Sequence, residues 1–326
     1  MNTIGRIFRI AIFGESHGTQ VGVLLDGVPV GIELNETDFM HDIQRRKSGN
    51  IGTSTRIEKD TPYIQSGIYK GKTTGAPILI FFKNENSKSD DYTQIKNIPR
   101  PGHADFTSKI KYKGHNDPRG GGHFSGRMTL ALVAAGVLAK KIISTIHFSS
   151  KIISINGNEN IEEAIATAIT KQDTVGGIVE CKVSNVPIGW GEPFFDSIES
   201  VISHLVFSIP SVKGIEFGSG FASATMWGSD HNDAIMDEFG KTKTNHAGGI
   251  NGGISNGNEL LFRVAIKPAS STPTIQSTYN FETKEVEQLQ ILGRHDLCIA
   301  LRVPIVIEAA AAIALADFSL LSKSQL

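Results

Sequence analysis

A glycine-rich loop near the middle of the chain carries residue types that suit an anionic ligand. Residues 119 to 127 read RGGGHFSGR, with an arginine at each end and Ser125 close to an apolar run. Glycines let main-chain amides approach a ligand closely, and the free amides at the start of a helix favour an anion. Arg119 and Arg127 could add forked hydrogen bonds to a phosphate. The alternative is a tight turn with solvated arginines, and physics alone leaves both open.

Three histidines lie in loops beside glycine or charged residues, where an imidazole could carry protons. They are His17 in GESHG, His103 in RPGHAD and His295 in GRHDLC. Imidazole titrates near neutral pH, so each could give or accept a proton, although a single histidine is more often structural. Asp296 supplies a potential base beside His295, and Ser16 is a neighbour of His17. No function is assigned to the histidines in helical or strand patterns, His41, His147 and His204.

A second glycine-rich stretch, HAGGINGGISNG, precedes a strand pattern and the sequence KPASS at residues 267 to 271. There Lys267, Ser270 and Ser271 offer an ammonium group and two hydroxyls, which suit a phosphate or the polar edge of a ring. Taken singly, each stretch is better explained as an ordinary hairpin or loop. The chain has no P-loop, dinucleotide fingerprint, HExxH motif, nucleophile elbow or kinase signature. The residues therefore indicate an enzyme with a polyanionic ligand and several proton carriers, and leave its reaction open.

The composition is that of a globular protein with no general attraction for anions. The chain has 326 residues, of which 40% are hydrophobic, 7% aromatic and 20% charged, and its formal net charge is -1. These values exclude disorder and coiled coil and argue against nucleic-acid binding, so an anion must be bound by a local cluster. Cys181 and Cys298 lie far apart without zinc-ligand spacing, so no metal site and no disulfide framework are predicted. A cytoplasmic location without a membrane anchor is expected.

The loops that hold these residues lie between segments with clear helical or strand patterns. Strands are predicted at residues 6–13, 21–25, 76–83 and 178–183. Helices are predicted after Asn35, over the apolar run at 128–143, after the capping pair Asn160 and Glu163, over 195–207 and over the apolar run at 304–321. Helices and strands do not alternate regularly, which favours an α+β fold. No linker or change in composition divides the chain, so residues 1–326 are predicted to form a single domain.

Eight motifs occur in order between about residues 4 and 315: GESHG, RRKSG, RPGHAD, RGGGHFSGR, IPSVKG, HAGGINGGIS, KPASS and GRHDLC. Together they closely resemble those of the chorismate synthase family. Enzymes of that family convert 5-enolpyruvylshikimate 3-phosphate to chorismate and phosphate by an anti 1,4-elimination, the last step of the shikimate pathway. The resemblance implies a layered β-α-β sandwich of antiparallel sheets around helices, assembled as a homotetramer.

The resemblance also implies a requirement for reduced FMN, although the reaction has no net redox change. In these enzymes the flavin lends electron density to the allylic system as phosphate leaves, and its N5 is the favoured acceptor of the C6 proton. The protein would supply orientation, charge and proton management. Because the chain lacks a dinucleotide fingerprint, a separate flavin reductase is expected, with NADPH only an indirect source of reducing equivalents.

The functional residues of the family correspond to positions of this chain through the shared motifs. His17 resembles the histidine that protonates reduced flavin, His103 the one that assists the departing phosphate, and Asp296 with Ser16 the pair that relays the N5 proton. Flavin contacts are implied for His123, Phe124, Ser125, Pro210, Ser211, Gly252, Lys267, Pro268, Ala269, Ser270, Ser271 and Arg294. Substrate contacts, or positive potential near the active-site mouth, are implied for Arg45, Arg46, Arg119 and Arg127.

The chain departs from the usual family motifs at three places. Many members have RGGGRSSAR, so His123 and Phe124 here replace a cation and a small hydroxyl residue. Members commonly have RHDPC where this chain has Leu297, and residues 48 to 56 depart from the usual RPG pattern. Two other interpretations remain, a protein of the same fold that binds FMN without turnover and a flavin reductase that uses NADPH. Retention of the histidines and of Asp296 argues against a simple binder, which needs no proton relay.

Overall fold

The computed structural model describes residues 2–86, 97–291, 293 and 295–324. The α-helices of this part of the chain are α1 (Met40–Arg46), α2 (Asp105–Lys111), α3 (Thr129–Ile142), α4 (Ile161–Lys171), α5 (Ile198–Phe207), α6 (Gly228–His231) and α7 (Pro304–Ser324). Short 3-10 helices include η1 (Glu36–Phe39), η4 (Arg119–Phe124), η5 (Gly126–Met128), η6 (Phe194–Asp196), η7 (Gly220–Thr225) and η8 (Ile299–Arg302).

Within the described residues, the strands form two larger antiparallel sheets and three two-stranded ribbons. The first sheet has the order β1 (Thr3–Ile4), β2 (Arg9–Gly14), β3 (Gln20–Asp26), β7 (Ile78–Lys83) and β4 (Tyr63–Ile64). The second has the order β10 (Val212–Phe217), β13 (Leu260–Ile266), β9 (Gly177–Ser184) and β8 (His147–Ile155). The ribbons pair β5 (Ile68–Tyr69) with β6 (Lys72–Thr73), β11 (Ile250–Asn251) with β12 (Ile254–Ser255), and β14 (Gln276–Asn280) with β15 (Glu285–Leu289).

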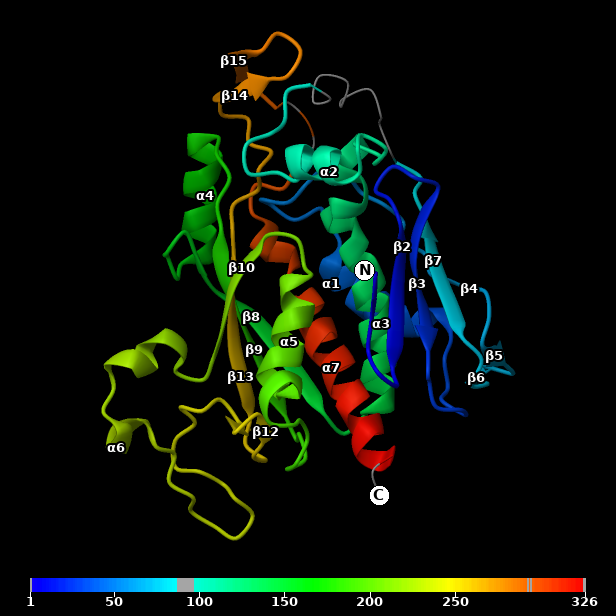
Figure 1. The fold of residues 1–326 in the computed structure, drawn as a ribbon, viewed down its shortest axis with the longest axis vertical. Coiled ribbons are helices and arrows are strands. Elements are labelled where there is room, and N and C mark those ends of the chain that lie inside the picture. The colour runs from blue at the N-terminus through cyan, green and yellow to red at the C-terminus, as the bar shows by residue number, and fades with distance from the viewer. Residues whose placement is uncertain (1, 87–96, 292, 294, 325–326) are drawn as a thin grey trace.

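Two long helices run side by side between these sheets, as Figure 1 shows. Helix α3 contacts β3, β2 and β7 of the first sheet, α7 contacts β8 and β9 of the second, and the two helices contact each other. Helix α5 packs on α7 and β10. Antiparallel sheets and helices in separate groups confirm the predicted α+β fold.

The two central helices correspond to the apolar runs of the sequence. α3 is buried from Thr129 to Ala139 and α7 from Ile305 to Ser319. Small residues allow close approach, because a Cβ added at Gly136 would lie only 2.7 Å from the Cα of Ala309. α7 is long and apolar enough to cross a membrane, yet 83% of its most apolar window is buried inside the protein. That burial is typical of the core helix of a globular protein.

Polar residues start the helices where the sequence predicts. Asn35 accepts a hydrogen bond from the Thr37 N–H at 3.0 Å at the start of η1, which continues into α1. Asn160 accepts from the Glu163 N–H at 3.2 Å before α4. The helix predicted at 195–207 begins its α-helical part only after Ser197, whose hydroxyl caps α5.

The strand predicted over residues 6–13 begins only at Arg9. The N–H groups of the three preceding residues donate to the carboxylate of Asp317 on α7, each at 2.8 Å. A carboxylate with these three donors satisfies the backbone as a strand ladder would. The start of β2 is therefore determined by a residue more than 300 positions away.

Candidate active site

Two adjoining cavities collect most of the predicted site residues. The larger, of about 670 Å³, is lined among others by His103, His123, Phe124, Ser125, Pro210, Ser211, Lys267, Ala269, Ser270, Ser271, Arg46 and Asp296. The smaller, of about 170 Å³, is lined among others by Ser16, Arg46, Ser125, Arg127 and Asp296. The shared residues show that the motifs predicted to act together meet at one place in the fold.

The glycine loop separates two of the predicted catalytic histidines. Gly120, Gly121 and Gly122 have φ of 58°, 81° and 53°, a region that side chains disfavour. A Cβ at Gly120 would overlap the ring of His17, and one at Gly121 would lie 3.4 Å from Nε2 of His103. The glycines are therefore required for the main chain to pass between the two imidazoles.

A buried ion pair holds His103 through its Nδ1 atom. Asp105 Oδ1 lies 2.5 Å from this nitrogen, and Arg100 donates to both carboxylate oxygens of Asp105 at 2.7 and 2.8 Å. Burial raises the pKa of Asp105, but hydrogen bonds from Arg100 and His103 outweigh it and hold that pKa well below its usual range. Arg100 Nη2 also lies 3.0 Å from Nδ1. Because the ionised carboxylate is closer and only accepts, Nδ1 carries a proton and Nε2 is left for chemistry.

The KPASS loop is bound to the loop that carries His103. Lys267 donates to the carbonyl of Gly102 at 3.1 Å and to the hydroxyl of Ser270 at 2.7 Å. Arg100 donates to the hydroxyl of Ser271 at 3.0 Å. Burial lowers the pKa of Lys267, and the charge of Lys213 lowers it further. Two motifs more than 160 residues apart thus form one cationic wall of the larger cavity.

His17 lies behind the glycine loop and is 8% exposed. Burial lowers its pKa from the ordinary value of 6.5, and the positive charges of Arg56 and Arg119 lower it further. The imidazole is therefore neutral at pH 7 and able to accept a proton. A bound anion nearby would favour the protonated form, which could then donate.

Replacing Arg56 by methionine is expected to raise the pKa of His17, because it removes a neighbouring cation that disfavours the imidazolium. Since the pKa of His17 in the folded protein lies below 6.5, protonation of His17 opposes folding, and the stability of the wild-type protein falls as the pH drops below about 6.5. This loss of stability should be less steep in the Arg56 variant. NMR titration of the His17 ring checks the pKa, with Lys59→Met, which removes an exposed lysine paired with Glu85, as the control. An unchanged His17 pKa in the Arg56 variant would show that burial alone lowers it.

Two arginines hold predicted catalytic groups from the walls of the smaller cavity. Arg56 donates to the Ser16 hydroxyl and carbonyl, both at 3.3 Å, and is itself paired with Glu58 at 2.7 Å. Arg302 donates to the two carboxylate oxygens of Asp296 at 3.2 and 3.0 Å. Sequence motifs do not identify either arginine as part of the site, because each one binds a residue that belongs to a different segment of the chain.

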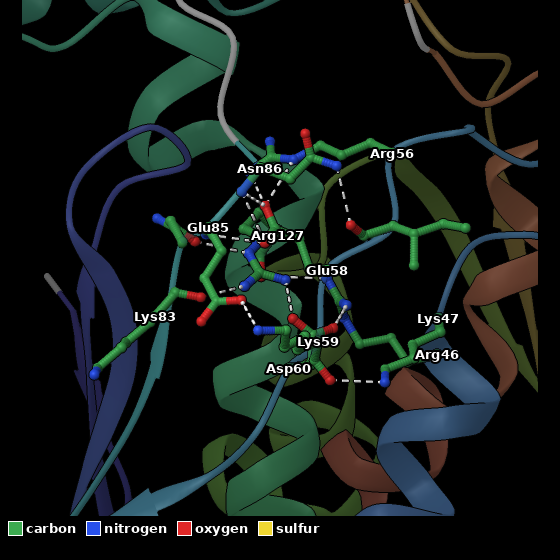
Figure 2. A network of polar contacts seen from close by, with 12 residues as sticks. Arg46, Lys47, Arg56, Glu58, Lys59, Asp60, Lys83, Glu85, Asn86 and Arg127 are labelled. Carbon is green, nitrogen blue, oxygen red and sulfur yellow. Dashed lines mark hydrogen bonds and ion pairs between the residues drawn. The ribbon is translucent and has the colours of Figure 1, made fainter.

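A buried acidic residue joins two of the predicted substrate-binding arginines. Figure 2 shows Asp60 between Arg46, at 3.6 Å, and Arg127. Burial, together with the charge of Arg302, lowers the pKa of Arg46 to about 9, which still leaves the guanidinium charged at neutral pH. The walls of the smaller cavity hold five cationic side chains, Arg46, Lys47, Arg56, Arg127 and Arg302, and three acidic ones, Glu58, Asp60 and Asp296. Their excess positive charge suits an anion.

The other two predicted arginines make ion pairs outside the cavity walls. Arg45 donates to Glu308 of α7 at 2.6 and 2.9 Å, and Glu308 is 1% exposed. Arg119 pairs with Asp117 at 2.8 Å, with nearly half of its side chain exposed. The structure therefore does not bring these two guanidinium groups into contact with the cavity.

Two predicted flavin contacts line neither cavity, and a third lies outside the described residues. Gly252 lies in the turn between β11 and β12, with no atom within 4 Å of a Cβ built on it. Pro268 packs beside Gly176, while its neighbours on both sides line the larger cavity. Arg294 lies outside the described residues. His204, to which the sequence assigns no function, lines the larger cavity instead.

Comparisons with known proteins are consistent along the whole chain. A family model described as chorismate synthase matches residues 8–320. A chorismate synthase of Chitinophaga pinensis is 59% identical, covering 99% of this chain and 98% of the relative. One of Methanocaldococcus jannaschii is 40% identical, covering 97% and 96%. A crystal structure of chorismate synthase superposes with a TM-score of 0.74 at 29% identity, covering 98% of this chain and 93% of that chain.

Proposed function

Because the chain belongs to the chorismate synthase family, we propose that its larger cavity binds 5-enolpyruvylshikimate 3-phosphate beside reduced FMN. The chain is a lyase that eliminates phosphate from this substrate to give chorismate, the last step of the shikimate pathway. One observation supports the location of the site. Residues of seven of the eight motifs, all except HAGGINGGIS, line the two adjoining cavities.

The residues of the larger cavity suit a flavin. Its volume, about 670 Å³, lies within the usual range for ligand pockets. Ile10, Ile12, Met128, Leu132, Val303 and Val306 offer apolar contact to a flat ring, and Lys267, Ser270 and Ser271 offer donors to a phosphate or a polar ring edge. Bound reduced FMN would supply electron density to the allylic system of the substrate as phosphate leaves. Residues 123–125, Pro210, Ser211, Lys267 and residues 269–271 would hold it.

His103 would assist the departing phosphate. Its Nδ1 proton is held by Asp105, so a second proton on the ring would lie on Nε2. Nε2–H would then donate to the phosphate oxygen on which negative charge develops. Arg100 keeps the carboxylate ionised and in place.

The proton that the substrate loses at C6 would be relayed by Ser16 and Asp296, and His17 would protonate the reduced flavin. The Ser16 hydroxyl and the Asp296 carboxylate both face the smaller cavity, each held by an arginine. Ser54 N–H adds a further hydrogen bond of 2.7 Å to Asp296. These groups could pass a proton between Oγ and Oδ atoms. Neutral His17, behind Gly120, could take up a proton and return it.

The excess of cations around the smaller cavity supports substrate binding by Arg46 and Arg127. The positive charge of Arg119 lowers the pKa of His17, so Arg119 would add positive potential to the site from the surface. Arg45 would act indirectly, by holding α1 against α7.

The remaining family properties complete the proposal. One hydrophobic core runs through both sheets and the central helices, which supports a single domain in the family's layered β-α-β sandwich. We also propose a cytoplasmic homotetramer whose reduced FMN comes from a separate flavin reductase, with NADPH only as the indirect electron source.

Anaerobic turnover of 5-enolpyruvylshikimate 3-phosphate with dithionite-reduced FMN tests the proposal, with chorismate followed by absorbance. Chorismate should form only when the reduced flavin is present, and Lys267→Ala should weaken FMN binding. Tight FMN binding without chorismate would instead support a binding protein. Steady NADPH oxidation by the pure protein with FMN would contradict the separate reductase.

A further inference from the structure

Residues 2 to 4, which precede every motif named above, form part of the wall of the larger cavity. Asn2, Thr3 and Ile4 all line it. Strand β1 pairs with Ile10 and Ala11 of β2, and the Ile12 N–H donates to the Asn2 carbonyl at 2.9 Å. The main chain of this wall is therefore held by the first sheet.

Asp317 fixes the other end of the same segment. Its carboxylate, 8% exposed on α7, accepts the N–H groups of Arg6, Ile7 and Phe8. Between this anchor and β1 the chain turns at Gly5, with φ of 100°, where a Cβ would clash with the Phe8 carbonyl. Because both ends are held, the position of Asn2 is determined by the fold.

The side chain of Asn2 meets the histidine that replaces the usual arginine of the glycine loop. Asn2 Oδ1 lies 3.2 Å from His123 Nε2, and the Gly14 carbonyl lies 2.9 Å from His123 Nδ1. A carbonyl only accepts, so Nδ1 carries a proton. An amide can accept from Nε2–H of a charged ring or, after rotation, donate to Nε2 of a neutral one. Asn2 can therefore hold the ring in either protonation state.

We propose that Asn2 is a positioning residue of the flavin site, which acts by holding His123 between the Gly14 carbonyl and the wall formed by residues 2 to 4. The proposal rests on the proposed function, since His123 lines the cavity assigned to the flavin. Because both ring nitrogens have hydrogen-bond partners, the His123 ring is held in one orientation. His123 lies in the segment that leads from the glycine loop to α3. Loss of the amide would release the ring and the backbone that carries it.

A double-mutant cycle for FMN binding tests this coupling. Asn2→Ala is expected to weaken FMN affinity by about three- to tenfold, the usual effect of one lost hydrogen bond. In a His123→Ala background the same change should have no further effect, because its partner is already gone. The control is Arg9→Ala, which removes an exposed side chain paired with Asp26 on the neighbouring strands. Unchanged affinity in Asn2→Ala, or equal losses in both backgrounds, would overturn the proposal.

The imidazole ¹⁵N signals of His123 separate this inference from the function itself. They are measured without flavin, in wild type and in Asn2→Ala, with thermal unfolding showing that both are folded. The proposal expects a protonated Nδ1 in wild type and a shifted Nε2 signal in the variant. If the wild-type protein binds no FMN, the proposed function fails. Whether or not FMN binds, an Nε2 signal that is unchanged in Asn2→Ala would overturn the role of Asn2.

Discussion

His103→Ala is expected to reduce turnover by about 10²- to 10⁴-fold, the usual contribution of a general acid or base. FMN affinity should remain within about threefold of wild type, since the loss is confined to proton transfer. His147→Ala is the matched control, because His147 is exposed at the start of β8 and lines neither of the two cavities. Anaerobic turnover with reduced FMN and a separate FMN titration distinguish the two quantities. Turnover equal to wild type would remove His103 from the mechanism.

Asp105→Asn tests the role of His103 through the carboxylate that contacts its Nδ1 atom. The amide can donate to Nδ1, where the carboxylate only accepts, so the proton of a neutral His103 would move to Nε2. A neutral imidazole is a much weaker acid than an imidazolium, so turnover should fall nearly as far as in His103→Ala. The double variant should be no slower than the slower single one. The ionised Asp105 also holds Arg100, so thermal unfolding must confirm that the variant is folded. A variant with normal turnover across the pH range would show that the carboxylate is only structural.

Gly120→Ala is expected to reduce turnover by about a hundredfold or more. The added Cβ would overlap the ring of His17, and φ of 58° is unfavourable for alanine. The loop or the imidazole must move, and a misplacement of about 1 Å can cost roughly 10²-fold in rate. Turnover and FMN affinity should both fall, unlike in His103→Ala, because residues 123–125 of the same loop are proposed to hold the flavin and the Ser16 N–H donates to the Gly122 carbonyl.

Gly228→Ala is the matched control for this change. Gly228 has no atom within 4 Å of a built Cβ and no left-handed φ, and it lies in α6 on the projecting part of the chain seen in Figure 1. Its activity should be that of wild type. If Gly120→Ala also kept full activity, the close passage of the loop past His17 could not matter for catalysis.

Much of the fold was predictable because its signals are local. The apolar runs that become α3 and α7 are long enough to require burial on most faces, whatever surrounds them. Asn35 and Asn160 cap helices through N–H groups two or three residues away, so a short window of sequence contains the whole interaction. The boundary at Arg9 was predicted too early because Asp317, which sets it, lies on the last helix.

The sequence by itself determined the α+β class, the central helices, the family and the loops that carry chemistry. Only the tertiary structure decided which side chains of those loops meet. Arg45 and Arg46 are adjacent in sequence, yet one pairs with Glu308, 263 residues away, and the other lines both cavities. Asn2, Arg56 and Arg302 join the site in the same way. A guanidinium binds a buried carboxylate as well as a ligand, so its partner depends on how distant elements pack.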